Sequence, residues 1–264
     1  MTLSKAQRTI PRKRGVHQWV DVPQPKINRT NDRAIVTVAV GANALELSSW
    51  TTDSMRKYAD RCHADFHVIT GKTQSWPLLE KFRVKPYAEA YDQLLFLDVD
   101  CIVRDDCQNL FDRLETAFHN DWPELPADAW ACNGWRGLMA SQGAIDRPFV
   151  HGRMLNSGVV LCRREDAAMW TPPTHPVPGL HCDEQMWIES NLGVYGIEYG
   201  LLELRHNTQW YMPRVRSKEV LAQAEILHLA GCPWKNRPRL ASLLRDSWEA
   251  GLDAVLDSMK VPQC

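Results

Sequence analysis

The sequence predicts an α/β protein with a doubly wound mixed sheet, in which the strands of the first hundred residues run parallel. In the first hundred residues, short apolar runs alternate with segments of helical periodicity, which is the pattern of consecutive strand-helix-strand units. A length of 264 residues, with 44% hydrophobic and 24% charged residues, suits one large soluble domain. Ligands of such sheets bind beyond the carboxyl ends of the strands, so polar residues at those positions are the first candidates for a functional site.

The first half supplies three strands and two helices in alternation. The first strand is closed by Gly41, and Pro86 is expected to bend or split the second helix. In chain order, these elements are a strand over 35–40, a helix over 44–62, a strand over 66–69, a mostly helical segment over 78–91 and a strand over 94–97.

The second half begins with a loop-rich segment and ends in an amphipathic helix. Proline and glycine recur between residues 119 and 155, and an apolar stripe at helical spacing follows residue 240. The elements expected between them are a strand over 159–162, an acidic helix start within 181–188, and strands near 197–204 and 225–231.

Composition excludes several classes of function. The net charge of −1 gives no reason to expect nucleic acid as a partner. The eight cysteines form no C-x-x-C pair, and no run reaches the roughly 18 to 20 apolar residues that span a bilayer. The start of the chain has no apolar leader. We therefore expect a cytoplasmic protein without a transmembrane segment.

The most informative stretch is the strand at 94–97 together with the two carboxylates that follow it. In an extended chain Asp98 and Asp100 would point to the same face, roughly 6.5 to 7 Å apart along the strand. Crowded carboxylates repel unless a cation neutralises them, and hard divalent ions favour oxygen ligands. Asp98 and Asp100 therefore predict a metal site, although an isolated pair of this kind is also typical of a solvated acidic turn.

Four pieces stand in order along the chain: Tyr91 to Asp100, Asn156-Ser157-Gly158-Val159, Asp183-Glu184-Gln185, and His228-Leu229-Ala230-Gly231 with Lys235. Together they resemble the GT-A nucleotide-sugar glycosyltransferases, most closely family 8, the glycogenin and galactosyltransferase type. The resemblance covers about residues 34 to 240. It implies a GT-A domain over 34–264 after a basic, proline-containing arm over 1–33. Within the domain, it implies a nucleotide-binding half over 34–118, an acceptor and sugar half over 119–240 and a C-terminal helix over 240–260.

The resemblance also implies a metal set and a donor site. Asp98, Asp100 and His228 would hold Mn²⁺, with Mg²⁺ as the alternative, and an imidazole among the ligands favours Mn²⁺. This chain departs from the family pattern after Gly231, because Lys235 stands one residue late and Asn236 replaces a proline. Lys235 and Arg237 therefore share the expected phosphate contact. The full set of expected donor-binding residues is Val40, Lys81, Asp98, Asn156, Ser157, Gln185, Gly231, Lys235 and Arg237.

Asp183 and Glu184 are the expected catalytic carboxylates. In a retaining enzyme of the resembling kind, this region supplies the group beneath the anomeric carbon, whereas an inverting enzyme would use a general base here. Both could also simply charge a helix N-terminus. The expected reaction moves a sugar from a UDP-sugar to a hydroxyl of a glycan, lipid-linked or protein acceptor, with retention. Trp135, Trp210 and Trp234 are candidates for the acceptor side.

Three other classes fit parts of the sequence. A haloacid-dehalogenase-type phosphatase would use Asp98 as nucleophile and Asp100 as acid and base, but it needs a later acidic pair where this chain has His228. A sugar-nucleotide pyrophosphorylase would need a glycine-rich N-terminal loop, which Gly41 to Glu46 does not provide. A non-catalytic nucleotide-sugar-binding module would keep the donor site without turnover.

Overall fold

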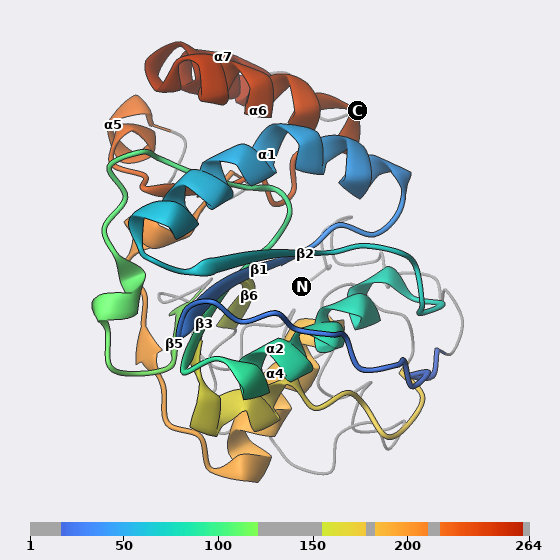
Figure 1. Ribbon diagram of the computed structural model, residues 1–264. Coiled ribbons are helices and arrows are strands. Elements are labelled where there is room, and N and C mark those ends of the chain that lie inside the picture. Colours follow the sequence, from blue (N-terminus) through green and yellow to red (C-terminus); the bar gives the residue numbers. More distant parts are fainter. Residues whose placement is uncertain (1–16, 121–154, 178–182, 211–216, 261–264) are drawn as a thin grey trace, which may run out of the picture.

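A mixed sheet of six strands forms the centre of the protein (Figure 1). The computed structural model describes residues 17–120, 155–177, 183–210 and 217–260. The strand order is β2-β1-β3-β6-β5-β7; β1 is parallel to β2 and β3, whereas β6 is antiparallel to β3 and β5. The bounds are β1 (Arg33–Val38), β2 (Asp65–Ile69), β3 (Gln93–Leu97), β5 (Ala117–Asn120), β6 (Leu155–Arg163) and β7 (Gly200–Leu201). The predicted α/β class and mixed sheet are confirmed.

Helices cover both faces of this sheet. Figure 1 shows α1 over one face and α2 and α4 over the other. Alternate residues of β3 serve the two sides: Leu95 and Leu97 pack in the cluster that contains α1, and Leu94 and Phe96 pack in the opposite cluster. The bounds of the covering elements are α1 (Ala42–Arg61), the 3₁₀ helices η2 (Pro77–Val84) and η4 (Arg164–Trp170), α2 (Lys85–Ala90) and α4 (Asp183–Tyr195).

A small second sheet carries the chain beyond the central sheet. Its strand order is β4-β9-β8, with β9 antiparallel to β4 and parallel to β8. Its apolar side chains share a core with the C-terminal helices, which lie beyond α1 in Figure 1. The remaining bounds are β4 (Cys101–Val103), η3 (Leu110–Asp112), η5 (Leu204–His206), β8 (Thr208–Gln209), α5 (Lys218–Ala222), β9 (Ile226–His228), η7 (Trp234–Asn236), α6 (Arg237–Asp246) and α7 (Trp248–Lys260).

Two elements differ from the sequence prediction. The single closing helix is two helices, because Ser247 is extended and α7 turns back onto α6. Gly251 makes this close packing possible, since a Cβ at this residue would lie 2.7 Å from the backbone of Leu244. The strand expected over 197–204 is reduced to the two residues of β7. The helical segment before β3 divides as predicted, with Pro86 in the first turn of α2.

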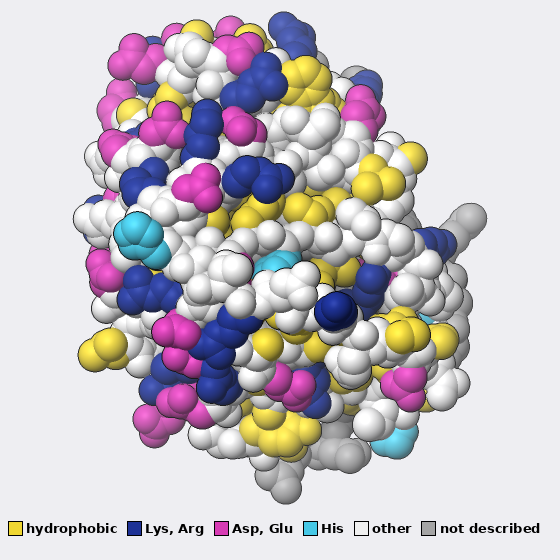
Figure 2. Space-filling model, viewed as in Figure 1, with side chains coloured by type: hydrophobic (Ala, Val, Ile, Leu, Met, Phe, Trp, Pro, Cys, Tyr) yellow, Lys and Arg dark blue, Asp and Glu magenta, His cyan; other side chains and the backbone are white. Residues whose placement is uncertain are grey.

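The described part of the N-terminal arm lies against the domain. Residues 17–32 form no regular element, but His17 pairs with Val177 and Trp19 packs edge-on against Phe82. On the face shown in Figure 2, acidic and basic side chains are interspersed. Within the described ranges, no helix has the length and apolar character needed to cross a membrane.

Candidate functional site

Asp98 and Asp100 lie in a tight turn between β3 and β4, and this corrects the prediction that they share one extended strand. The Cys101 amide donates to the Asp98 carbonyl at 2.9 Å, which closes the turn, and β4 then joins the second sheet. Helix α1 holds the turn through Thr51, whose hydroxyl donates to the Val99 carbonyl at 2.7 Å. Because the chain leaves the central sheet after β3 and joins the second sheet at β4, residues 98–100 form a turn and do not extend the strand.

His228 meets both carboxylates at the end of β9. Its Nε2 lies 3.2 Å from Asp100 and 3.7 Å from Asp98. In the β4–β9 pair, His228 lies opposite Cys101. Ligand atoms of Asp100, Cys101 and His228 all lie within 4.8 Å of one another. Burial raises the pKa of the Cys101 thiol well above its ordinary value. Asp98 was the third ligand expected from the sequence, and its role as a ligand remains a prediction.

Gly158 explains how the imidazole comes so close to the central sheet. A Cβ at this position would lie 2.2 Å from Cε1 of His228, so only glycine fits against the ring. The same residue anchors the turn, because its carbonyl accepts from the Asp98 amide at 2.7 Å. A glycine inside a buried strand often marks such a close approach.

Lys81 reaches the cluster from η2. Its Nζ lies 3.0 Å from Asp98, 3.1 Å from Ser157 Oγ and 3.2 Å from Glu184. The lysine is buried, and burial alone would lower its pKa, but Asp98 and Glu184 raise that pKa above its ordinary value. Lys81 is therefore a fixed positive charge between two carboxylates. The structure brings together Lys81, Asp98, Ser157 and Glu184, all of which were selected from the sequence.

The two carboxylates of the turn have opposite pKa shifts. Burial raises the pKa of Asp98, and the nearby cations Lys81 and His228 do not fully offset it. Burial would also raise the pKa of Asp100, but His228 and Arg237 lower it below its ordinary range. A divalent cation beside Asp98 would lower its pKa as well. Asp100 is thus firmly ionised, whereas the cations around Asp98 are too few to offset the effect of burial on its pKa.

The start of α4 presents polar atoms without partners. Glu184 and Gln185 are both buried, and Ser157 connects them, donating its amide to Gln185 and its hydroxyl to Glu184. Among the described residues, Glu184 Oε2 and Gln185 Nε2 have no hydrogen-bond partner. Unsatisfied buried groups are costly, so they favour a ligand that completes them. Asp183 begins the helix, and its side chain lies outside the described part of the structure.

Arg237 contacts the acidic turn, whereas Lys235 does not. The Arg237 guanidinium lies 2.5 Å from Asp100 and stacks on Trp234, while Lys235 is exposed on η7. Gly231 adopts a φ of 75°, which allows the sharp turn between β9 and η7. Val40 is half-buried just after β1, at the same edge of the central sheet as the acidic turn. Their donor contacts remain predictions.

The other residues expected to contact sugars have different surroundings. Asn156 is buried, and its amide bonds with Gly158, Asn207 and Gln209 inside the protein. Trp210 is buried in the core beside the second sheet, and Trp234 is 43% exposed. Trp135 lies outside the described residues. Their roles toward sugar or acceptor remain predictions.

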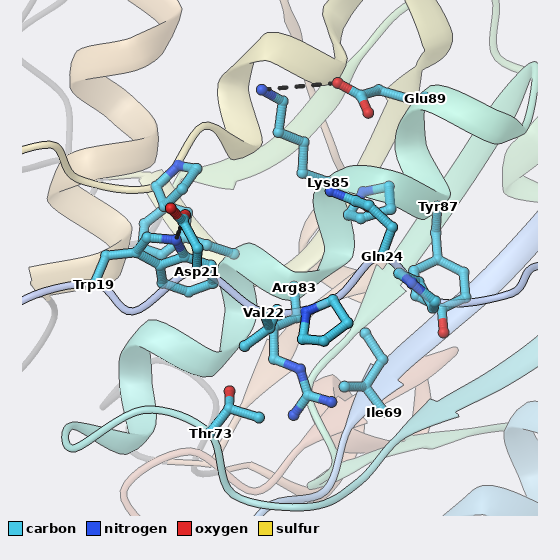
Figure 3. A pocket seen from close by; sticks show the side chains of 15 residues that line it. Trp19, Asp21, Val22, Gln24, Ile69, Thr73, Arg83, Lys85, Tyr87 and Glu89 are labelled. Carbon is cyan, nitrogen blue, oxygen red and sulfur yellow. Dashed lines mark hydrogen bonds and ion pairs between the residues drawn. The ribbon is translucent and has the colours of Figure 1, made fainter.

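A separate cavity of about 410 Å³ lies between the N-terminal arm and the η2–α2 segment (Figure 3). Trp19 lines it from the arm, and Phe82, Arg83 and Tyr87 line it from the other side. The Arg83 guanidinium is already engaged by the carbonyls of residues 70 and 71 and by Glu80. None of the acidic-turn residues lines this cavity, so we place the candidate active site at the turn.

Comparison with known proteins gives the fold class. No protein-family model matches the chain, and no curated protein does. The solved structure of the bifunctional glycosyltransferase WbbM aligns with a TM-score of 0.51 and 12% identity over 88% of this chain. This chain spans 53% of the WbbM chain. That likeness, with the observed sheet, shows a GT-A glycosyltransferase fold.

Two further solved structures are similar to the chain at lower scores. A glycosyltransferase involved in glycosylation of the major capsid of PBCV-1 has a TM-score of 0.49 and 14% identity, covering 79% of this chain and 98% of its own. The galactosyltransferase LgtC, solved with donor and acceptor sugar analogues, has a TM-score of 0.45 and 15% identity, covering 87% of this chain and 98% of its own.

Sequence reasoning missed two residues that shape the site. Thr51 anchors the acidic turn from α1, and Asn207 contacts His228 from the segment before β8. No sequence pattern marks either residue, because threonine is common in helices and asparagine is common in loops. Both contacts join residues that are far apart in the chain, and only the fold reveals them.

Proposed function

We propose that the protein is a metal-dependent glycosyltransferase that moves a sugar from a nucleotide sugar, most simply a UDP-sugar, to an acceptor hydroxyl with retention. The observation that carries the proposal is the convergence of Asp98, Asp100 and His228 with Lys81 and Glu184 at one edge of a GT-A sheet. This edge is where doubly wound sheets bind their ligands. The resemblance to family 8 in four ordered motifs supports the same function.

The residues present suit a divalent cation. Two carboxylates and an imidazole nitrogen, which would release its proton on ligating an ion, form the donor set, and such a mixed set favours Mn²⁺ over Mg²⁺. Asp100 and His228 are buried and Asp98 is partly exposed, yet the pKa of Asp98 is raised, so additional positive charge would stabilise its ionised form. When bound, the ion would neutralise charge on the donor diphosphate as a Lewis acid.

The protein's own groups would supply the remaining chemistry. Arg237 and Lys235 are the candidates for the departing phosphate, with Arg237 the better placed because it is already at the turn. Gln185 Nε2 is a free donor among the described residues and would orient a sugar hydroxyl. Glu184, with one unpartnered oxygen, is our candidate to stabilise positive charge at the anomeric carbon.

Calorimetric titration with UDP, with and without Mn²⁺, tests the proposal. We expect binding that needs the ion and that falls by about 100-fold or more in Asp100→Asn, because the variant removes a charged ligand. Asp105→Asn is the matched control, since Asp105 is exposed just beyond β4. Metal-independent binding, or equal affinity in wild type and Asp100→Asn, would contradict the proposal.

A second measurement separates an enzyme from a binding module. Purified protein that binds UDP should hydrolyse or transfer from a panel of UDP-sugars in the presence of Mn²⁺. Binding without any turnover across the panel, with acceptor glycans included, would favour the non-catalytic module.

A further inference from the structure

The geometry points to Asn207 as a positioning residue that holds a proton on Nδ1 of His228, so that Nε2, which faces Asp98 and Asp100, is the nitrogen available to ligate a cation. The inference rests on the proposed function, because it assigns a role to the imidazole that would ligate the ion. It concerns this chain's own hydrogen bonds, so it is testable even without substrate.

Asn207 is completely buried and lies next to the imidazole. It follows η5 and directly precedes β8, whose Gln209 is registered beside His228 of β9. Asn207 Oδ1 lies 3.0 Å from His228 Nδ1, and Asn207 Nδ2 lies 2.8 Å from Asn156 Oδ1. The asparagine therefore bridges the histidine and the motif on β6.

One backbone amide sets the direction of every bond in this network. The Gly158 N–H can only donate, and it donates to the Asn156 side chain at 2.9 Å, so the atom that faces it must be the oxygen. A reversed Asn156 would place its own amide N–H groups against this backbone donor. The Asn156 amide nitrogen consequently faces Gln209 Oε1 at 3.2 Å.

The oxygen of Asn156 in turn fixes the orientation of the Asn207 amide. Asn156 Oδ1 also faces Asn207, so the Asn207 atom beside it must be the donating nitrogen. The Asn207 oxygen then faces His228, and a hydrogen bond there requires a proton on Nδ1. Nε2 is then the nitrogen that faces the two carboxylates: while protonated it donates to Asp100, and once that proton leaves it has a lone pair for a cation.

This is the arrangement that a metal-ligating histidine requires. The nitrogen opposite the ligating one usually donates to an acceptor that fixes the tautomer and the ring orientation. Here a neutral amide performs that role, and Gly158 leaves room for the ring, because a Cβ there would lie 2.2 Å from Cε1 of His228.

The variants Asn207→Leu, Asn207→Asp and Thr208→Val test the inference. Leucine removes the acceptor at similar volume, and aspartate keeps an oxygen for Nδ1 while opposing Asn156. Thr208→Val is the matched control, because Thr208 is equally buried but donates to the Leu204 carbonyl, away from the histidine. Mn²⁺ affinity is measured by the electron paramagnetic resonance signal of the free ion, and unfolding is followed alongside.

We expect Asn207→Leu to weaken Mn²⁺ binding by about 10- to 100-fold, the usual effect of removing such a partner. Thr208→Val should bind Mn²⁺ like wild type even if it unfolds earlier. Asn207→Asp should regain most of the affinity although it is less stable. A purely structural role would lower affinity and stability together in all three variants, and this result would overturn the inference.

A second measurement reads the tautomer directly. ¹⁵N spectra of histidine-labelled protein, with the His228 signal assigned by its loss in His228→Gln, should show a proton on Nδ1 in the wild type, with or without a second proton on Nε2. A wild-type ring that is protonated on Nε2 alone would overturn the inference without any Asn207 variant. If wild type lacks Mn²⁺ binding but shows Nδ1–H, the metal role in the proposed function fails while the tautomer assignment holds.

Discussion

Two buried carboxylate clusters lie at opposite ends of the parallel strands, and they differ in how their charge is satisfied. Asp65 begins β2 and accepts hydrogen bonds from Thr30, Asn31 and the Tyr91 hydroxyl. Although burial would raise the pKa of Asp65, these donors lower it below its ordinary value. The protein's own hydrogen-bond donors therefore satisfy the Asp65 carboxylate.

The cluster at the other end is incomplete. Asp98 retains a raised pKa beside Lys81 and His228, and Glu184 Oε2 and Gln185 Nε2 have no partner within the described ranges. Burial alone therefore does not distinguish a functional carboxylate from a structural one. The useful distinction is whether the protein's own donors and cations saturate the group, because an unsaturated buried cluster favours a bound ligand.

The strongest test of this contrast is Glu184→Gln. The amide keeps the shape of the side chain but loses its charge, so we expect turnover to fall by about 10²- to 10⁴-fold while UDP affinity stays close to that of wild type. Steady-state transfer and calorimetric titration measure the two quantities. Glu198→Gln, an exposed position beyond α4, is the control. Unchanged turnover would remove Glu184 from the catalytic groups.

The next effect in size is expected from Gly158→Ala. The added Cβ would overlap the imidazole of His228, so the ring must move and Mn²⁺ affinity should fall by about tenfold or more. Gly200→Ala on β7 is a matched control, because its Cβ would meet only the end of the flexible Glu115 side chain. Equal Mn²⁺ affinity in the two variants would show that the ring position is not critical.

These residues also show how far the sequence could be interpreted. The apolar runs located β1, β2, β3 and β6. The ordered motifs located Asp98, Ser157, Glu184 and His228, and the family resemblance added Lys81; the structure brings these five residues together. The turn at 98–100 was taken as strand because local apolar character does not reveal that the chain leaves one sheet for another. Asn207 escaped notice because its partners lie in other strands.

The complementary variant at the satisfied end is Asp65→Asn. The amide cannot accept from all of its donors, so we expect the free energy of unfolding to fall by about 1 to 3 kcal/mol with Mn²⁺-dependent UDP binding unchanged. Denaturant unfolding and calorimetry provide the two readouts. Asp92→Asn is the control, since Asp92 is an exposed ion-pair residue and should cost less than about 1 kcal/mol. Loss of UDP binding in Asp65→Asn would link the two ends.

The smallest expected effect is a difference in pH dependence between the two ends. The pKa of Asp65 is lower in the folded than in the unfolded protein, so its stabilisation is full above the unfolded value of about 4 and is lost as pH falls toward the folded value. The pKa of Asp98 is raised in the folded protein, so its ionised form destabilises the fold, and protonation on acidification relieves this cost.

Urea unfolding between about pH 5 and about pH 3 should therefore show a shallower loss of stability in Asp65→Asn than in wild type, and a steeper loss in Asp98→Asn. Parallel curves for the two variants would show that both carboxylates are equally satisfied, and the distinction between the two ends would fail.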